Sequence, residues 1–226
     1  MNRLYFVRHA ENVANLTKEF SYRQVDYSLT EKGVLQAQQT ADYFQNITLD
    51  AVYASPLKRA VETAQFIAAP HHLPVTIREN FREINCGRLE REPVSAKNWA
   101  LYMDITADWL DGQPERAFPD GENFPALWTR IRAGFAEMCA DRDHQNLVLV
   151  GHGGWFVATL NQFCPAADIN LLRGADAVNC SITEMLIEPH TLTGDLVRWN
   201  DHTHLHGDAA QIVRGWPQLD QLPDVT

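Results

Sequence analysis

Two histidines and two arginines lie where short apolar segments end. Arg8 and His9 directly follow one apolar run, and His152 closely follows another. Arg59 lies five residues beyond a third. A planar guanidinium group matches the oxygens of phosphate and stays charged at physiological pH, and a neutral imidazole can attack phosphorus as a nucleophile. These side chains predict attack by one histidine on phosphorus while cations neutralise the equatorial oxygens, a chemistry that needs no metal ion.

The segments around these residues alternate between strand and helix patterns. Buried strands are expected at residues 3–7, 50–54, 74–77 and 147–150, and a late hairpin at 182–187 and 196–199. Helices are expected from Thr30 as N-cap, from Ser55 as N-cap with Pro56 in the first turn, over residues 122–140, and from the glycines after His152 to Phe163. A loop of about 20 residues separates the first strand from the first helix, and loops of that length are usually functional or disordered.

Strands that alternate with helices predict an α/β fold with a largely parallel sheet. In such sheets, ligands bind beyond the carboxyl ends of the strands. Because Arg8, His9, Arg59 and His152 each follow a strand, we expect all four at that edge of the sheet.

The length and composition indicate how many domains to expect and which partners are excluded. One domain over residues 1–226 is expected, with a cap insertion at about residues 85–121, called here the cap segment. A net charge of −10 argues against nucleic acid or an anionic membrane surface as partner, and the apolar runs are too short to span a bilayer. The first apolar run is also too short for a signal peptide, and the four widely spaced cysteines indicate reduced thiols, so we expect a cytoplasmic location.

Five sequence blocks resemble the histidine phosphatase superfamily, also called the phosphoglycerate mutase-like family. They are residues 6–12 with Asn15, residues 26–33, residues 55–64, residues 82–87 and residues 150–154. The first contains Arg-His in the sequence Phe-Val-Arg-His-Ala-Glu-Asn, and the last is Val-Gly-His-Gly-Gly. The blocks follow the order of the family, and the resemblance runs from Arg3 to about His204.

The resemblance implies a three-layer α/β/α sandwich and a role for each matching residue. His9 would accept the phosphoryl group, and Glu83 would protonate the leaving oxygen and then activate water. His152 would act beside them in the catalytic centre. The groups implied to bind phosphate are Arg8, Asn15, Arg59, His152 and Gly153. The family implies no cofactor and no metal, and the expected partner is a small phosphorylated metabolite.

The chain departs from the family pattern at three places. Ala10 replaces a commoner glycine, and Asn12 stands where serine or threonine is usual. Glu90 is followed by Arg91, which breaks a frequent Glu-Gly pair. The first two departures concern the substrate contacts, and the third concerns the geometry of the cap segment.

Three functions fit this resemblance. A phosphatase of small phosphomonoesters is favoured over a phosphoglycerate-type mutase, because the mutase's longer inserts and its Glu-Arg-x-Tyr-Gly sequence are absent. A catalytically silent relative that binds phosphorylated ligands is a third alternative. The presence of His9, Glu83 and His152 argues against it, since such a relative needs neither a nucleophile nor an acid. The substrate and the oligomeric state do not follow from the sequence.

Several residues have a second interpretation. Glu83 lies in an acidic stretch and could belong to a solvated surface. The alternating His202, His204 and His206 could bind a metal if they lay on one strand, although the resemblance favours a structural motif near the C-terminus. Trp99 and Tyr102 could pack the cap segment or form a pocket wall. The glycines around His152 match no nucleotide-binding pattern and predict a tight turn.

Overall fold

A six-stranded mixed sheet forms the centre of the computed structural model, which describes residues 1–168, 170, 172 and 176–223. The strands are β1 (Asn2–Arg8), β2 (Ala51–Ala54), β3 (Val75–Ile77), β4 (Asn146–Gly151), β5 (Ile182–Ile187) and β6 (Gly194–Asp201). Their order is β3-β2-β4-β1-β5-β6, with the first four parallel and β5 and β6 antiparallel. The expected parallel sheet and late hairpin are confirmed. The last three residues of the expected domain lie outside the described residues.

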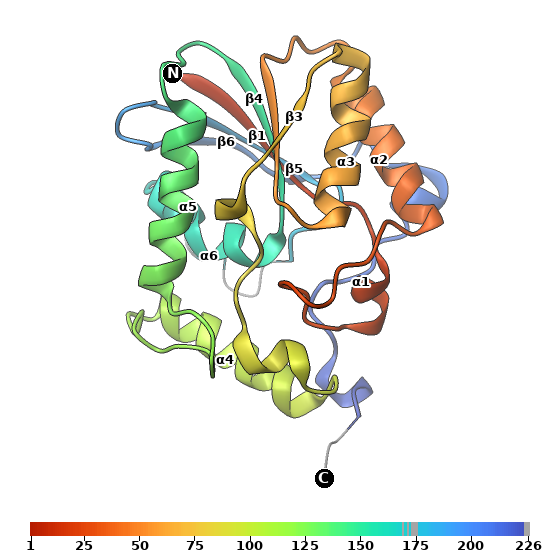
Figure 1. The fold of residues 1–226 in the computed structure, drawn as a ribbon, viewed down its shortest axis with the longest axis vertical. Coiled ribbons are helices and arrows are strands. Elements are labelled where there is room, and N and C mark those ends of the chain that lie inside the picture. Colours follow the sequence, from red (N-terminus) through yellow and green to blue (C-terminus); the bar gives the residue numbers. More distant parts are fainter. Residues whose placement is uncertain (169, 171, 173–175, 224–226) are drawn as a thin grey trace.

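Helices cover both faces of the sheet (Figure 1). Helices α2 (Glu31–Phe44) and α3 (Lys58–Ala68) cover one face, and α5 (Phe124–Cys139) and α6 (Gly153–Phe163) cover the other. Side chains alternate along each strand, so Val7 packs toward α2 and α3 whereas its neighbour Phe6 packs toward α5 and α6. The inner parallel strands β1, β2 and β4 are mostly apolar on both faces because both faces are buried. The three-layer α/β/α architecture is confirmed.

Two further helices lie at the carboxyl ends of the parallel strands. The segment between β1 and α2 contains a short helix, α1 (Val13–Thr17), whose N-cap Asn12 forms a reciprocal capping box with Asn15. The cap segment contains α4 (Ala96–Leu110), which begins after the N-cap Ser95. Figure 1 shows α4 beyond this end of the sheet, beside the C-terminal part of the chain.

The predicted start of α3 is wrong. Ser55 is not the N-cap: the helix begins at Lys58 after Leu57, which makes no side-chain cap. The Asp26 carboxylate instead accepts the backbone N–H of Lys58 at 2.9 Å. The Ser55 hydroxyl lies 2.6 Å from Nε2 of His152 and is used there.

The three late histidines do not share a strand face, because β6 ends at Asp201. Nε2 of His204 lies 3.1 Å from the Thr40 hydroxyl, which ties the end of the chain to α2. Among the described residues no group of three histidine, cysteine or acidic side chains is placed to hold a metal. Within the same residues no helix has the length and apolar character needed to cross a bilayer.

Candidate active site

A cavity of about 500 Å³ lies at the carboxyl ends of the parallel strands. Its lining residues come from the end of β1, from α1, α3, α4 and α6, from the segment that follows β3, and from the C-terminal part of the chain. Arg8, His9, Asn15, Arg59 and Glu83 are all among them, as is Gly153. The expected convergence of strand ends is therefore confirmed.

His9 is held as a neutral imidazole whose Nε2 carries no proton. Its Nδ1 lies 2.8 Å from the Ala10 carbonyl, which can only accept, so Nδ1 carries the proton. Nε2 therefore carries a lone pair, and Nε of Arg59 donates to it at 3.0 Å. Burial lowers the pKa of His9 well below its usual value, and the charges of Arg59 and Arg8 lower it further. Nε2 is thus unprotonated at neutral pH, as a nucleophile requires.

His152 lies directly behind this pair. Its ring centroid is 5.2 Å from that of His9, and its Nδ1 accepts from Arg59 at 3.1 Å, which leaves Nε2–H to donate to Ser55. Burial and then the Arg59 charge hold its pKa well below the usual value. His152 is fully buried and is not a lining residue of the cavity. In this arrangement it contacts Arg59 rather than the space that a substrate would occupy.

Arg59 connects the two histidines to the loop above them. It sits in the first turn of α3, where a bound anion is favoured by the helix dipole. Besides its contacts to both imidazoles, it donates to the hydroxyl and the carbonyl oxygen of Ser21 at 2.7 and 3.0 Å. Burial lowers its pKa to about 10, so it remains charged at neutral pH.

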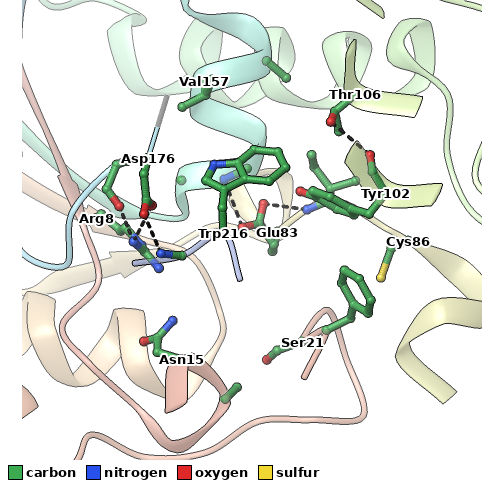
Figure 2. A pocket seen from close by; sticks show the side chains of 18 of the residues that line it. Arg8, Asn15, Ser21, Glu83, Cys86, Tyr102, Thr106, Val157, Asp176 and Trp216 are labelled. Atoms are coloured by element: carbon green, nitrogen blue, oxygen red, sulfur yellow. Dashed lines mark hydrogen bonds and ion pairs between the residues drawn. The ribbon is translucent and has the colours of Figure 1, made fainter. Parts of the chain in front are cut away.

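Arg8 supplies the second guanidinium group. It donates to the Ala177 carbonyl and lies 3.6 Å from the Asp176 carboxylate (Figure 2). Burial lowers its pKa, and the Asp176 charge opposes that shift. Asp176 therefore holds Arg8 at the cavity wall.

Asn15 is oriented by two bonds to its amide oxygen. These come from the backbone N–H of Asn12 at 3.1 Å and from the side chain of Asn179 at 3.2 Å. Because both use the oxygen, the amide nitrogen is the end that can meet a phosphate oxygen in the cavity.

Glu83 lies at the N-terminus of α6 and does not belong to a solvated acidic surface. Its carboxylate accepts the backbone N–H groups of Gly154 and Trp155 at 3.2 and 3.0 Å, and that of Ile84 at 2.8 Å. A Cβ at Gly154 would lie 2.8 Å from the carboxylate and 2.7 Å from the Tyr102 hydroxyl. Glycine at 154 therefore permits the close approach that places Glu83 beside the cavity.

Arg130 fixes the chain on the other side of Glu83. It donates to the carbonyls of Asn80 and Arg82, both at 2.7 Å, and to that of Glu83 at 2.9 Å, while pairing with Glu122 at 2.7 Å. Sequence reasoning missed this residue. The signal was an arginine immediately before the buried Ile131, on a helix whose apolar stripe it adjoins.

The loop that holds Ser21 is itself secured by Glu90. One oxygen of its carboxylate accepts the backbone N–H groups of residues 22–25, at 2.6 to 3.2 Å. Arg91, which departs from the family pattern, is exposed and pairs with Asp120. The departure thus leaves the Glu90 contact in place.

Replacing Arg59 with lysine is expected to lower kcat/KM by about 10²–10³-fold, mainly through kcat. An ammonium keeps the charge but cannot donate to both imidazoles and to Ser21 at once. Steady-state kinetics on a phosphate ester would measure this, with exposed Arg132→Lys as the matched control. A kcat/KM within about threefold of wild type would contradict the assigned contacts.

The free energy of unfolding is expected to decrease as the pH is lowered below the ordinary histidine pKa. The folded-state pKa values of His9 and His152 are lowered by burial, so below pH 6.5 the unfolded chain binds protons that the native state does not. Their stabilising contribution is full above that pH and is lost as the pH falls toward the lowered values. Each histidine adds a slope of at most about 1.4 kcal/mol per pH unit.

Urea unfolding from about pH 7 to about pH 5 checks this slope. His9→Gln should flatten it, whereas His144→Gln should not, because the side chain of His144 is 84% exposed. Equal slopes in wild type and His9→Gln would show that His9 does not titrate differently on unfolding.

Comparison with known proteins identifies one matching family and several similar relatives. The family model described as histidine phosphatase superfamily (branch 1) matches residues 4–202. A Hydrogenobacter thermophilus protein named "Putative phosphoserine phosphatase 2" is 31% identical over 193 residues, covering 83% of this chain and 91% of the relative. A Proteus mirabilis protein named "Probable phosphoglycerate mutase GpmB" is 30% identical over 194 residues, covering 82% and 85%.

A solved structure is similar over the same span. Phosphoserine phosphatase from Entamoeba histolytica, in complex with 3-phosphoglyceric acid, is 26% identical with a TM-score of 0.73. The match covers 91% of this chain and all of that one. The chain belongs to the histidine phosphatase superfamily.

Proposed function

We propose that this chain is a metal-independent phosphatase that hydrolyses a small phosphomonoester through a phosphohistidine at His9. The observation that carries the proposal is the neutral His9 imidazole, with Nε2 unprotonated and next to Arg59 at the cavity wall. Family membership and the names of the relatives support it.

In the first step, Nε2 of His9 attacks phosphorus as the bond to the ester oxygen breaks. The leaving oxygen takes a proton from Glu83, which must then be protonated when the ester binds. In the second step, Glu83 takes a proton from water, and the oxygen attacks the phosphohistidine. The P–N bond breaks, inorganic phosphate leaves, and both side chains return to their first state.

The remaining groups stabilise charge on the transferred phosphoryl group. Arg8 and Arg59 provide guanidinium donors, and Asn15 an amide donor, to the equatorial oxygens. The N-terminus of α6 at Gly153 presents a positive dipole end to the same region. His152 holds Arg59 in place for this task.

A panel of phosphate esters assayed with and without a chelator tests the proposal. Phosphate release is expected on several esters at rates that the chelator leaves unchanged. Loss of release with the chelator, restored by added metal, would overturn metal independence. No release from any ester would overturn the phosphatase assignment.

A mutase is the second candidate, because one relative carries that name and a similar structure holds 3-phosphoglyceric acid. The two functions differ in product. A phosphatase releases inorganic phosphate from phosphoglycerate, whereas a mutase forms the isomeric phosphoglycerate. Phosphorus NMR of the reaction mixture separates them.

The proposed partner is a small phosphorylated metabolite. Similar solved structures hold phosphoserine and 3-phosphoglyceric acid, which supports this class of ligand. All four cysteines are free and buried, which fits the reducing conditions of a cytoplasm. We further propose that the 226 residues form one domain, with the cap segment as an insertion that covers the cavity.

A further inference from the structure

The cavity has two chemically different ends. The phosphate end is formed by Arg8, His9, Asn15, Arg59 and Glu83. The other end, called here the apolar chamber, is lined by Trp99, Tyr102, Met103, Leu110, Val157 and Trp216. Figure 2 shows Trp216 between Arg8 and Asp176 on one side and Tyr102 and Thr106 on the other. An ester bound by its phosphate can extend its organic part into this chamber.

Aromatic rings form the nearest walls of the apolar chamber. Trp99, Tyr102 and Trp216 pack against one another, with ring centroids 5.5 to 6.3 Å apart. Trp99, Tyr102 and Met103 come from one side of α4, and Leu110 comes from its last turn. Such rings offer large apolar surfaces and favour edge and offset contacts with another ring.

Two polar side-chain atoms of these walls are already bonded within the protein. Nε1 of Trp99 donates to the Lys18 carbonyl at 2.9 Å. The hydroxyl of Thr106 donates to the Tyr102 carbonyl at 3.0 Å. A polar organic group entering the chamber would therefore find few free donors with which to replace its lost hydration.

The charges around the cavity leave little attraction for a second anion beside the phosphate. Among the lining residues that the structure describes, positive charge comes from Arg8, Lys18 and Arg59, and negative charge from Glu19, Glu83 and Asp176. Asp176 pairs with Arg8, and Nζ of Lys18 donates to the Arg214 carbonyl. The two arginines, Arg8 and Arg59, would already bind the phosphate of the ester. Among the described lining residues, Lys18 is the one cation beyond the two phosphate-binding arginines, and it is matched by the acidic groups of Glu19 and Asp176.

We infer that the substrate is the phosphomonoester of an apolar, ring-bearing alcohol. This inference rests on the proposed function and names its substrate class. A cavity of about 500 Å³ holds far more than a phosphate, and pockets of roughly 300–1,000 Å³ accept ring-bearing ligands. Trp216 is the specificity-determining wall.

Trp216 is linked to the phosphate end through its neighbour. The N–H of Gly215 donates to the Asp176 carboxylate at 2.6 Å, and Asp176 pairs with Arg8. A Cβ at Gly215 would lie 2.6 Å from that carboxylate, so glycine permits the contact. The indole ring is thereby placed against the organic part of a substrate whose phosphate contacts Arg8.

Three esters with primary alkyl leaving groups test the inference: 2-naphthylmethyl phosphate, ethyl phosphate and O-phosphoserine. Because the three leaving groups are chemically similar, differences in kcat/KM reflect how the organic part of each ester contacts the protein. Wild type is expected to prefer the naphthylmethyl ester by about 100-fold or more over both others. Trp216→Ala should lower kcat/KM for that ester by about tenfold and change ethyl phosphate by less than about threefold. Trp128→Ala, on α5 and outside the cavity lining, is the matched control.

A second variant keeps the test open if Trp216→Ala fails to fold. Met103→Lys places an ammonium group in the apolar chamber and should shift the preference toward O-phosphoserine by about tenfold or more. Equal turnover of O-phosphoserine and the naphthylmethyl ester by wild type would overturn the inference while leaving the phosphatase intact. An unchanged preference in both variants would also overturn it. No release from any of the three esters or from p-nitrophenyl phosphate would instead overturn the proposed function.

Discussion

Replacing His9 with alanine is expected to lower kcat for phosphate release by about four to six orders of magnitude, because the nucleophile is lost. Arg8, Arg59 and the α6 N-terminus remain, so ligand binding should persist. The measurement is phosphate release under saturating ester, with binding followed by calorimetry. His144→Ala, whose side chain is 84% exposed in wild type, is the matched control.

Two results would contradict this expectation. Turnover by His9→Ala within about tenfold of wild type would show that another group attacks phosphorus. Equal inactivity of wild type and His9→Ala on a broad ester panel, with phosphorylated ligands still bound, would identify a silent binding relative.

Replacing Glu83 with glutamine is expected to lower kcat for an alkyl phosphate by about 10²–10⁴-fold. The amide neither protonates the leaving alkoxide nor accepts a proton from water. With p-nitrophenyl phosphate, whose leaving group needs no proton, the first step should survive and the second should remain slow. The phosphoenzyme would then accumulate, and stopped-flow absorbance should show a burst of one p-nitrophenolate per active site.

Glu79→Gln is the matched control for that experiment, because the Glu79 side chain is 69% exposed and four residues away. It should show wild-type turnover and no added burst. A Glu83→Gln protein with equal losses on both kinds of ester and no burst would contradict the double role of Glu83.

The layers of the fold were predictable because the burial pattern is local. Neighbouring strand residues such as Phe6 and Val7 face opposite cores, and both are apolar, which identifies a strand buried on both faces. The first residue of a helix is harder to predict from the sequence. Ser55 is a good local N-cap, but its hydroxyl lies 2.6 Å from Nε2 of buried His152 and accepts the backbone N–H of Leu57 at 3.4 Å, so it makes no cap bond to the first turn of α3. The helix α3 begins two residues later than the local signal indicates.

The strand-end rule likewise placed Arg8, His9, Arg59 and His152 together, because chain order and strand direction suffice for that. That rule could not predict which of these side chains reach the open cavity and which lie behind it. His152 lies behind Arg59 and not at the open cavity, since its place depends on Ser55 and Arg59 from a distant part of the chain. Residues that hold a catalytic or phosphate-binding side chain in place are harder still to predict.

Asp176 and Arg130 reach Arg8 and Glu83 across long sequence separations, and neither lies in a recognisable motif. The two interpretations of Trp99 and Tyr102 prove compatible, because both rings are buried and both line the cavity. Packing and recognition use the same aromatic cluster.

Direct detection of the phosphorylated imidazole tests the central claim. Wild type and Glu83→Gln would be mixed with p-nitrophenyl phosphate, quenched in alkali and mapped by peptide mass spectrometry. A single phosphoryl group is expected on His9, released by acid, more abundant in Glu83→Gln and absent from His9→Ala. A phosphoryl group on another residue, or none on any residue of turning-over Glu83→Gln, would contradict it.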